Sequence, residues 1–466
     1  MTGQKTDPVL VEARRLAGDP EDSYRDRIVA ALYARAQTIA YRTVKVAPAP
    51  CQDFDWRLDA ILTSRLWGYP IMLALLAVVF WLTLKGANYP SALLASLLFA
   101  FQDILTSLFH QLGAPAWLHG IVVLGMYRTL AWVVAVMLPP MAIFFPLFTL
   151  LEDLGYLPRI AFNLDNFFKK AGAHGKQALT MCMGFGCNAA GVVGCRIIDS
   201  PRERLLAILT NNFSPCNGRL PTLITLAAIF MGGLLTTAAG AVAATLTVAG
   251  IILLGIVLMF FTSWLLSRTL LKGVPSSFTL ELPPYRPPQV LRVITRSVLD
   301  RTLYVLARAV LVAAPAGAFT WVLANVHLGA FSIIDHMAGW LQPLGKAVGL
   351  DGYILLAFIL GLPANEIVIP ILLMSYLSIG MLTEVDSLAT LGEILVRHGW
   401  TWVTALNVML FSLMHWPCGT TLLTIYKETK SLKWPLLAAV IPTALGLAAC
   451  FLVKLLAGLL GAALGG

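Results

Sequence analysis

The sequence predicts an all-α polytopic membrane protein, a helical bundle with two related halves that contain broken or re-entrant helices. Of its 466 residues, 58% are hydrophobic and only 12% are charged, and the mean hydropathy of +0.79 lies outside the range of soluble domains. Several apolar stretches exceed the roughly 18 residues that a spanning helix needs. These stretches cover residues 66–84, 130–151, 234–266 and 434–453. Because lipid leaves unpaired backbone groups unsatisfied, and the alternating pattern of a membrane β-barrel is absent, we expect them to be helices.

The chain begins with its only polar block. Residues 1–60 combine mixed charges with apolar residues at helical spacing, which indicates a cytoplasmic N-terminal helical segment. No basic start followed by a short apolar core is present, so we expect no cleavable signal peptide. Residues 61–115 follow as a first transmembrane helix, from about Leu66 to Lys85, and an amphipathic segment that we expect in the outer interface. Gln102, Asp103 and His110 interrupt that segment.

Two membrane halves make up the rest of the chain. Residues 116–270 form the first half, in which Glu152 and Asp153 follow a span at the point where it leaves the apolar core. Residues 271–301 are rich in proline and basic side chains; the prolines prevent a helix, and the positive charges place this linker on the cytoplasmic side. Residues 302–466 form the second half.

Charge and cysteine content limit the possible partners. The formal net charge is +9, and in a polytopic protein such an excess is explained by basic cytoplasmic loops, so membrane lipid is the expected counterpart and nucleic acid is not. The seven cysteines have no paired spacing, which argues against a disulfide scaffold. We expect Cys182, Cys195 and Cys450 to be small apolar fillers.

An internal correspondence links the two halves. AGAHGKQALTMCMGFGCN, from Ala171, aligns without gaps on VGLDGYILLAFILGLPAN, from Val348, 177 residues later. Each half also has a Pro-Cys pair before an apolar segment, SPCNGRLPTLITL and WPCGTTLLTIY, but 202 residues apart. The second half therefore carries about 25 extra residues between the two elements. Repeated halves whose helices break at matching positions are typical of secondary transporters. Close helix packing through small residues is the other explanation for the glycines.

Side chains at the breaks favour a metal path. Cys187 follows the first break, Cys216 and Cys418 lie in the Pro-Cys pairs, and Glu366 follows the second break. An ionisable residue within an apolar segment is a candidate functional residue, although Glu366 could instead pair with a helix terminus or a buried arginine. Thiolate, carboxylate and amide oxygen, the last from Asn188, suit a divalent metal of borderline softness such as Fe(II). Calcium and magnesium prefer more oxygen ligands.

The motifs GFGCN, DSPRERL, SPCNGRLP, LLEDLGYLPRIAF and HWPC together resemble the membrane region of ferrous iron transport protein B, called FeoB. The resemblance covers the chain from about Asp55 to its last helix. It implies import of Fe(II) through two Gate regions, so the two halves, 116–270 and 302–466, are the expected Gate halves. It also implies that Cys187, Cys216 and Cys418 are metal ligands, with Glu152 and Asp153 as an acidic pair. The family's Ala-Lys-Glu element corresponds to Ala364, Asn365 and Glu366, with asparagine in place of lysine.

The resemblance also sets expectations about partners. Members of the family usually begin with a GTPase domain, but the phosphate-binding motif GxxxxGK[ST] is absent from this sequence. We therefore expect a transporter and not an enzyme, with Fe(II) as substrate and no permanently bound cofactor. A separate GTPase protein, a small accessory protein and a homo-oligomer are possible partners. The expected location is the bacterial cytoplasmic (inner) membrane, crossed several times.

Two further functions stay open. The Gate fold is shared with nucleoside-recognition membrane proteins, so a nucleoside or other small solute is an alternative substrate, held by Asn188, Asn365 and nearby phenylalanines. A non-transporting assembly subunit, in which the cysteines and Glu366 only pack, is an alternative of a different class. An enzyme is the least favoured reading, because no catalytic constellation stands out.

Overall fold

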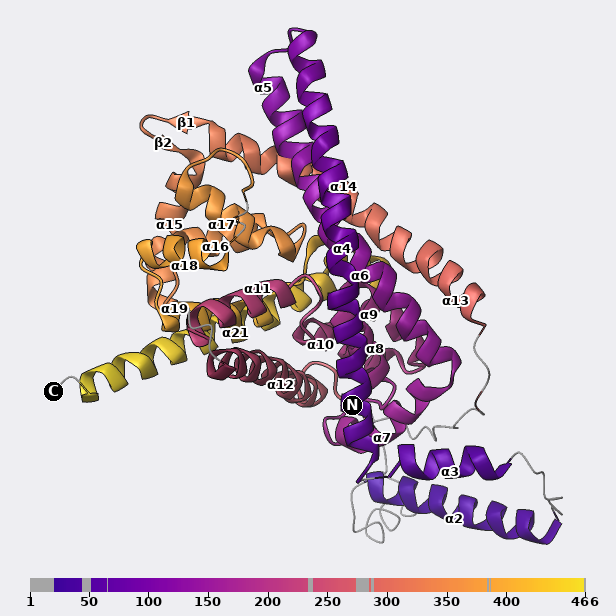
Figure 1. Cartoon of the computed structure of the whole chain (residues 1–466). Coiled ribbons are helices and arrows are strands. Elements are labelled where there is room, and N and C mark those ends of the chain that lie inside the picture. The colour runs from indigo at the N-terminus through magenta and orange to yellow at the C-terminus, as the bar shows by residue number, and fades with distance from the viewer. Residues whose placement is uncertain are drawn as a thin grey trace, which may run out of the picture.

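The computed structural model shows a bundle of helices with one short strand pair (Figure 1). It describes residues 21–43, 52–64, 66–233, 238–273, 285, 289–383, 385 and 387–464. Residues 274–284 and 286–288 of the predicted proline-rich linker, 271–301, lie outside the described residues, as do residues 1–20 and 44–51 of the N-terminal segment. Residues 290–301 of that linker are helical, so the expected absence of a helix is wrong there, because the prolines end at Pro288.

Helices of the N-terminal part are α2 (Glu21–Thr43), α3 (Gln52–Leu62) and α4 (Gly68–Gln111). The first half contains α5 (Ala116–His119), η1 (Gly120–Tyr127), α6 (Arg128–Asp153), α7 (Tyr156–Lys170), α8 (Gln177–Gly186), α9 (Asn188–Gly194), η2 (Cys195–Ile197), α10 (Pro201–Thr210), η3 (Asn211–Phe213), α11 (Leu220–Leu226), η4 (Ala227–Met231) and α12 (Ala238–Arg268).

The second half contains α13 (Val290–Arg296), η5 (Ser297–Thr302), α14 (Leu303–Asn325), β1 (His327–Leu328), β2 (Phe331–Ser332), α15 (Ile333–Val348), α16 (Gly352–Leu360), η6 (Asn365–Ile367), α17 (Val368–Leu377), α18 (Leu388–Arg397), α19 (Trp402–Met414), α20 (Gly419–Thr429) and α21 (Lys433–Leu464). Strands β1 and β2 pair antiparallel, His327 with Ser332 and Leu328 with Phe331.

Six helical stretches in the described part of the chain are long and apolar enough to cross a membrane, which confirms the predicted fold class. A seventh candidate is the pair α15 and α16, which bend by 111°. The six cover Gly68–Gln111, Ala116–Asp153, Ala239–Arg268, Val305–Asn325, Trp402–Thr429 and Lys433–Leu459. The four apolar stretches found in the sequence fall on four of them.

The predicted end of the first helix at Lys85 is wrong. Helix α4 continues through Pro90 to Gln111 as one helix of 44 residues, so the amphipathic segment is its upper part and stands beside α5 and η1 (Figure 1). A proline inside a helix removes a hydrogen bond and strains the preceding turn. Packing on either side offsets that cost, because Gly86 lies against Ile143 and Phe99 packs on Trp132.

Aligned positions of the two halves share backbone geometry. The π-helices η1 and η5 begin at Gly120 and Ser297, again 177 residues apart. Gly172 and Gly349 both have φ of 73°, a left-handed conformation that glycine adopts without strain. At the helix breaks, Cys187 has φ −154° and ψ 123°, and the aligned Ala364 has φ −153° and ψ 124°. The correspondence seen in the sequence thus extends to the main chain.

The second half has one element that the first half lacks. Helices α7, α8 and α9 precede α10 to α12 directly, whereas α18 and its flanking loops lie between α17 and α19. This insertion accounts for the change of offset from 177 to 202 residues. It leaves the two Pro-Cys segments at equivalent places in the order of elements.

A salt bridge attaches the N-terminal part to the first half. Arg159 Nε of α7 lies 2.9 Å from Asp59 Oδ1 of α3, and Tyr285 donates a 2.6 Å hydrogen bond to the same oxygen. The Arg159 guanidinium also lies 4.0 Å from the centre of the Tyr285 ring. Burial raises the pKa of Asp59, but the hydrogen bonds from Arg159 and Tyr285 outweigh it, so the pKa lies below its ordinary value of 3.8.

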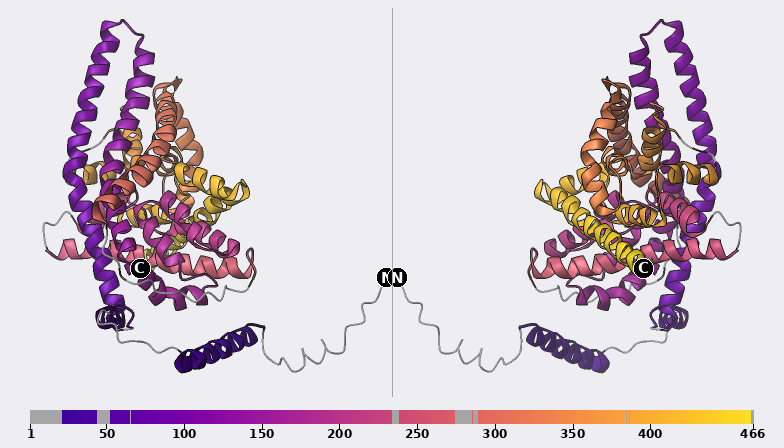
Figure 2. Two further views of the ribbon diagram at one scale, coloured as in Figure 1. Left: turned by 90° about the vertical axis from the view of Figure 1, so that its right-hand side faces the viewer. Right: turned by 90° about the vertical axis from the view of Figure 1, so that its left-hand side faces the viewer.

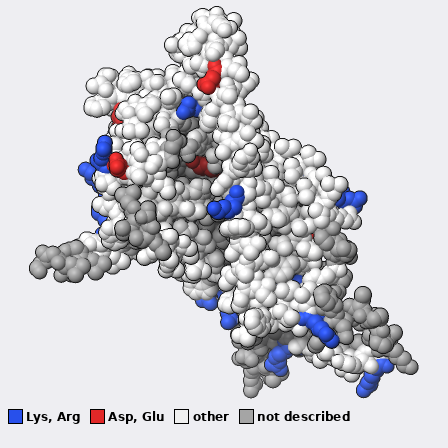
Figure 3. Space-filling view, viewed as in Figure 1, with Lys and Arg blue, Asp and Glu red and all other residues white. Residues whose placement is uncertain are grey.

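The two ends of the molecule differ in charge. The β1–β2 hairpin and the tips of α4 and α5 lie at one end, and α2, α3 and α7 lie at the other (Figures 1 and 2). On the face shown in Figure 3, basic side chains lie both toward the α2 and α3 end and elsewhere, whereas the visible acidic side chains lie toward the opposite end. The cytoplasmic location of the N-terminal segment stays a prediction.

Candidate functional site

Four interruptions of helices meet where the two halves pack together, and we call this region the junction. Backbone hydrogen bonds join them in pairs: Asn217 N donates to Gly186 O over 3.3 Å in the first half, and Gly419 N donates to Leu362 O over 2.6 Å in the second. Interrupted backbone at membrane depth needs such partners. The segments of the junction are 186–188, 214–217, 362–366 and 415–419.

A cavity of about 30 Å³ lies at the centre of the junction. Its lining includes all three cysteines predicted as ligands together with the predicted glutamate and asparagine, which come from both halves. The full lining is Met137, Met141, Gly186, Cys187, Asn188, Cys216, Asn217, Gly218, Pro363, Ala364, Asn365, Glu366, Cys418 and Thr420. A space of this size holds about one water molecule or one ion, since a water needs about 10–15 Å³.

Two of the three thiols lie at the start of a helix. Cys187 is the N-cap of α9 and Cys418 is the N-cap of α20. Cys216 Sγ accepts a 3.8 Å hydrogen bond from Asn365 Nδ2 of the other half. Cys418 Sγ lies 3.2 Å from Thr421 Oγ1. Each thiol is therefore held at the cavity by its own helix end or by an amide.

Glu366 connects the junction cavity to a second one. The second cavity has a volume of about 200 Å³, and Glu366 and Gly218 line both. A methyl group added at Gly218 would overlap the Glu366 carboxylate, so glycine is required for the carboxylate to reach this place. In Figure 3 a hollow on this face contains acidic atoms. Glu366 thus stands between a wider space and a narrow one.

The side chains of Asn188 and Thr420 also line the cavity and differ in their hydrogen bonds. When its amide is oriented to satisfy both groups, the Asn188 nitrogen donates to Ser214 O at 3.2 Å and Gly184 O at 3.1 Å, so it ties two breaks together. Thr420 Oγ1 is buried and has no hydrogen-bond partner among the described residues. Such an oxygen is an available ligand, since a buried hydroxyl without a partner is costly.

Arg219 joins the halves beside the cavity. Its side chain is fully buried, and it donates to five oxygens: Asn212 O and Leu413 O at 2.9 Å, Asn212 Oδ1 at 3.0 Å, and His415 O and Trp416 O at 3.2 Å. Three of them belong to the end of α19, where the last carbonyls of a helix have no partners of their own. In the described structure no carboxylate lies within ion-pair distance of this guanidinium.

His415 belongs to the junction but does not line its cavity. Its Nδ1 lies 2.8 Å from Ser412 O, and its Nε2 lies 3.2 Å from Asn365 Oδ1. Because Asn365 also reaches Cys216, a buried chain of contacts links the second half to a thiol of the first. His415 is a core histidine with a positioning role.

The acidic pair is not part of this cavity. Glu152 and Asp153 are exposed at the C-terminal end of α6, so their role in handling metal stays a prediction. Sequence reasoning missed Arg219 and the thioethers of Met137 and Met141. A charged residue within SPCNGRLP was a usable signal for the first, and the i, i+4 spacing on one helix was a weak signal for the others.

The junction does not form a ready-made metal site in this conformation. Among the described residues, no three His, Cys, Asp or Glu side chains are close enough to hold a metal ion together. Three thiols, a carboxylate and the Thr420 hydroxyl nevertheless line one ion-sized space.

Two family models match the chain. The one described as "Nucleoside recognition", named Gate, matches residues 134–230 and 306–432. The one described as "Ferrous iron transport protein B C terminus" matches residues 248–300. The two Gate matches cover all four segments of the junction and every residue that lines its cavity. No solved structure matches the chain.

Curated relatives carry the same family name. The chain is 29% identical over 403 residues to "Fe(2+) transporter FeoB" of Staphylococcus aureus strain MSSA476, covering 84% of this chain and 57% of the relative. It is 28% identical over 417 residues to the protein of that name from Methanocaldococcus jannaschii, covering 86% and 59%. A Porphyromonas gingivalis protein named "Fe(2+) transport protein A/Fe(2+) transporter FeoB fusion protein" is 25% identical over 445 residues, covering 85% and 51%. The chain thus spans little more than half the length of these relatives.

Proposed function

This chain belongs to the ferrous iron transport protein B family, to whose membrane region it corresponds, and from that premise we propose that it is a permease for Fe(II). The observation that carries the proposal is the meeting of Cys187, Cys216, Cys418 and Glu366 around one cavity. Thiolate sulfur and carboxylate oxygen together suit a borderline divalent metal.

The size of the cavity supports an ion as the substrate. About 30 Å³ admits one ion that has lost most of its water, whereas sites for small organic molecules measure about 300–1,000 Å³. A nucleoside does not fit the junction as it stands. The description of the Gate family model keeps nucleosides as the second candidate, and competition by uridine tests it.

Passage requires the two halves to move apart. Arg219 and Asn365 bridge the halves across the junction, so the halves are held together beside the cavity while these bonds persist. We infer that Fe(II) enters past Glu366, exchanges water for thiolate, carboxylate and hydroxyl ligands, and leaves when the bridging bonds rearrange. The carboxylate and thiolates offset the charge of the ion and of the nearby guanidinium.

Direction and partners follow from the same premise. The end with α2 and α3 is proposed to face the cytoplasm, so the chain would import Fe(II) across the bacterial cytoplasmic membrane. Glu152 and Asp153 lie at the C-terminal end of α6 and would attract the ion as it leaves. The name of the Porphyromonas gingivalis relative combines two iron transport proteins, which supports a small accessory partner. A GTPase acting in trans and a homo-oligomer remain predictions from the resemblance.

Uptake by vesicles tests the proposal. The purified chain is reconstituted alone and then with a candidate GTPase, and anaerobic Fe(II) entry is compared with empty vesicles. We expect Fe(II) entry that excess uridine does not reduce. Uridine competition would favour the nucleoside alternative, and no flux under either condition would favour a non-transporting assembly subunit.

A further inference from the structure

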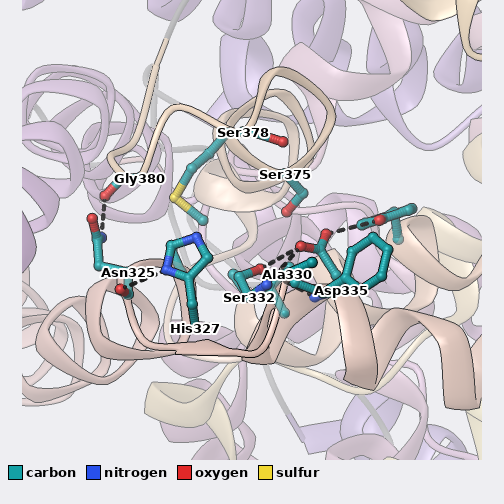
Figure 4. Close-up of a pocket in the computed structure, with 13 residues that line it drawn as sticks. Asn325, His327, Ala330, Ser332, Asp335, Ser375, Ser378 and Gly380 are labelled. Carbon is teal, nitrogen blue, oxygen red and sulfur yellow. Dashed lines mark hydrogen bonds between the residues drawn. The ribbon is translucent and has the colours of Figure 1, made fainter.

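A large pocket lies at the end of the molecule opposite α2 and α3, away from the junction. It has a volume of about 450 Å³, and the β1–β2 hairpin covers one side of it (Figures 1 and 4). The ends of α14 and α17 and the starts of α15 and α16 complete it. Its lining is Ala324, Asn325, His327, Ala330, Phe331, Ser332, Ile334, Asp335, Tyr353, Met374, Ser375, Ser378 and Gly380.

Two side chains in the pocket, His327 and Ser375, have atoms that can accept a further hydrogen bond or bind a cation. His327 Nδ1 lies 3.0 Å from the Asn325 carbonyl oxygen, to which it can only donate, so Nε2 is left as an acceptor. In Figure 4 the imidazole points from the hairpin into the space below α17. Ser375 Oγ donates to Ile371 O over 2.9 Å, which leaves its oxygen free to accept.

Asp335 adds a negative charge to the pocket, and its carboxylate can accept a further hydrogen bond. Its Oδ2 accepts from Ser332 N at 3.0 Å and Ser332 Oγ at 2.7 Å, and its Oδ1 accepts from Tyr353 Oη at 2.9 Å. A carboxylate has about four acceptor sites, so Oδ1 can accept one more hydrogen bond. The hydrogen bonds also fix the carboxylate in place.

Fixed charges around the pocket favour a cation. Its lining contains no lysine or arginine, and α14 and α17 both end there, at Asn325 and Leu377. The C-terminal end of a helix carries partial negative charge. The opposing positive ends, at the starts of α15 and α16, are each capped by an aspartate: Asp335 in its capping box with Ser332, and Asp351, which accepts from Ile354 N. The net field therefore attracts positive charge.

The pocket and the junction differ in size in the way that stepwise dehydration requires. Helix α17 connects them, with Glu366 just before its first turn and Ser375 and Ser378 at its far end. The cavity of about 200 Å³ borders the same helix through Ile369, Pro370 and Leu373. Volumes thus fall from about 450 Å³ to about 200 Å³ and then to about 30 Å³.

We propose that the outer pocket binds the hydrated divalent cation through His327, Asp335 and Ser375 before the ion loses its water at the junction. Acceptor atoms in a space of this size bind the hydrogens of coordinated water, and the imidazole can replace one water directly. This inference rests on the proposed function for the identity of the ion. Binding at the pocket is nevertheless independent of the cysteines.

Equilibrium dialysis of the purified full chain against radioactive Fe(II), under anaerobic conditions, tests the proposal. We expect two classes of bound Fe(II). His327→Ala should raise the Kd of one class about tenfold or more, equivalent to about 1.4 kcal/mol, and leave the other unchanged. Cys187→Ser should do the reverse. His336→Ala is the matched control, because His336 lies on α15 beside the hairpin and bonds Leu328 O without lining the pocket.

The outcomes separate the two proposals. If His327→Ala and Asp335→Asn both leave all Fe(II) binding intact while Cys187→Ser weakens it, the outer pocket is refuted and the permease proposal stands. If binding depends on His327 and not on Cys187, the pocket is supported and the junction loses its role. In uptake, His327→Ala should raise KM about tenfold with kcat unchanged, and a fall in kcat alone would contradict a capture site. Size-exclusion profiles of the variants identify any that fail to fold.

Discussion

The two halves place different chemistry on the same backbone. At the matched breaks the first half has Cys187, Asn188 and Ala189, and the second has Ala364, Asn365 and Glu366. The dihedral angles of Cys187 and Ala364 agree within a degree. The asparagine is common to both: the Asn188 amide bonds within its own half, and the Asn365 amide bonds Cys216 of the other half.

This difference separates scaffold from ligand. Main-chain geometry and the asparagines are shared, so they serve to build the breaks. The thiol and the carboxylate are not shared, so each half supplies a different kind of ligand to one cavity. The Pro-Cys segments also carry different side chains at aligned positions: Gly218 and Arg219 in the first half correspond to Thr420 and Thr421 in the second. Variants at Arg219, Glu366 and Cys187 test how far the asymmetry matters.

Arg219→Met should have the largest effect, on stability. The change leaves five buried oxygens without their donor, and each buried acceptor left without a partner costs about 1–3 kcal/mol. The counterpart Thr421→Val should cost less than about 1 kcal/mol, since one ordinary hydrogen bond is lost. Thermal unfolding in detergent, followed by tryptophan fluorescence, measures both.

Arg196→Met is the control for loss of a guanidinium, because Arg196 is 66% exposed and pairs with Glu428. It should leave unfolding nearly unchanged. If Arg219→Met and Thr421→Val lowered the stability to thermal unfolding equally, the two halves would contribute equally to the stability of the junction.

Glu366→Gln should reduce Fe(II) uptake by intact cells about 10- to 150-fold. Loss of an interaction with a charged group is worth about 1.5–3 kcal/mol, and each 1.36 kcal/mol is a factor of ten. Glu393→Gln, at a site 65% exposed on α18, is the matched control. Gly218→Ala should give a smaller loss by displacing the carboxylate, while Gly250→Ala, where a methyl group meets nothing, should be neutral. Uptake unaffected by Glu366→Gln would remove this residue from the path.

Cys187→Ala should reduce uptake about tenfold, consistent with the loss of one metal ligand worth roughly 1.4 kcal/mol. Adding Ala364→Cys to that variant should restore part of the uptake, because both positions line the cavity with the same backbone geometry. Cys182→Ala, a buried cysteine that does not line the junction cavity, should behave as the parent chain. If Ala364→Cys restored no uptake to the Cys187→Ala variant, the shared scaffold would be contradicted.

The attachment of α3 to the first half should show a small pH dependence. The pKa of Asp59 is lower in the folded chain than its ordinary value of 3.8, so its contribution is fully present above about pH 4 and is lost as the pH falls through the folded value. Asp59→Asn should remove it at neutral pH. The protection factors of the α3 amides, which correct for the intrinsic pH dependence of exchange, should then fall at pH 7 in the variant and change little between pH 7 and pH 5 in the parent chain. A fall in these protection factors between pH 7 and pH 5 in the parent chain would point to a different group.

The sequence allowed the membrane class and the pairing of the halves to be predicted, because apolar length and the positions of glycines are local properties. It also allowed Cys187, Cys216, Cys418 and Glu366 to be grouped, since each lies at a break. Where α4 ends could not be predicted, because the packing against α6 that supports Pro90 involves residues distant in the sequence.

Other parts of the site depend on contacts across the halves. The bonds of Arg219 and Asn365 could not be predicted, because their roles appear only once their partners Leu413 and Cys216 are placed beside them. The outer pocket is likewise assembled from the ends of elements that are far apart in the chain. Composition and spacing carry no information about such meetings.

The donor set at the junction is the central claim, and X-ray absorption at the iron edge of the anaerobically Fe(II)-loaded chain tests it most directly. We expect sulfur neighbours at about 2.3 Å, a typical metal–thiolate distance, together with oxygen neighbours. The sulfur contribution should fall when Cys187, Cys216 or Cys418 is replaced by serine. An iron shell of nitrogen and oxygen alone, unchanged by these replacements, would contradict the account.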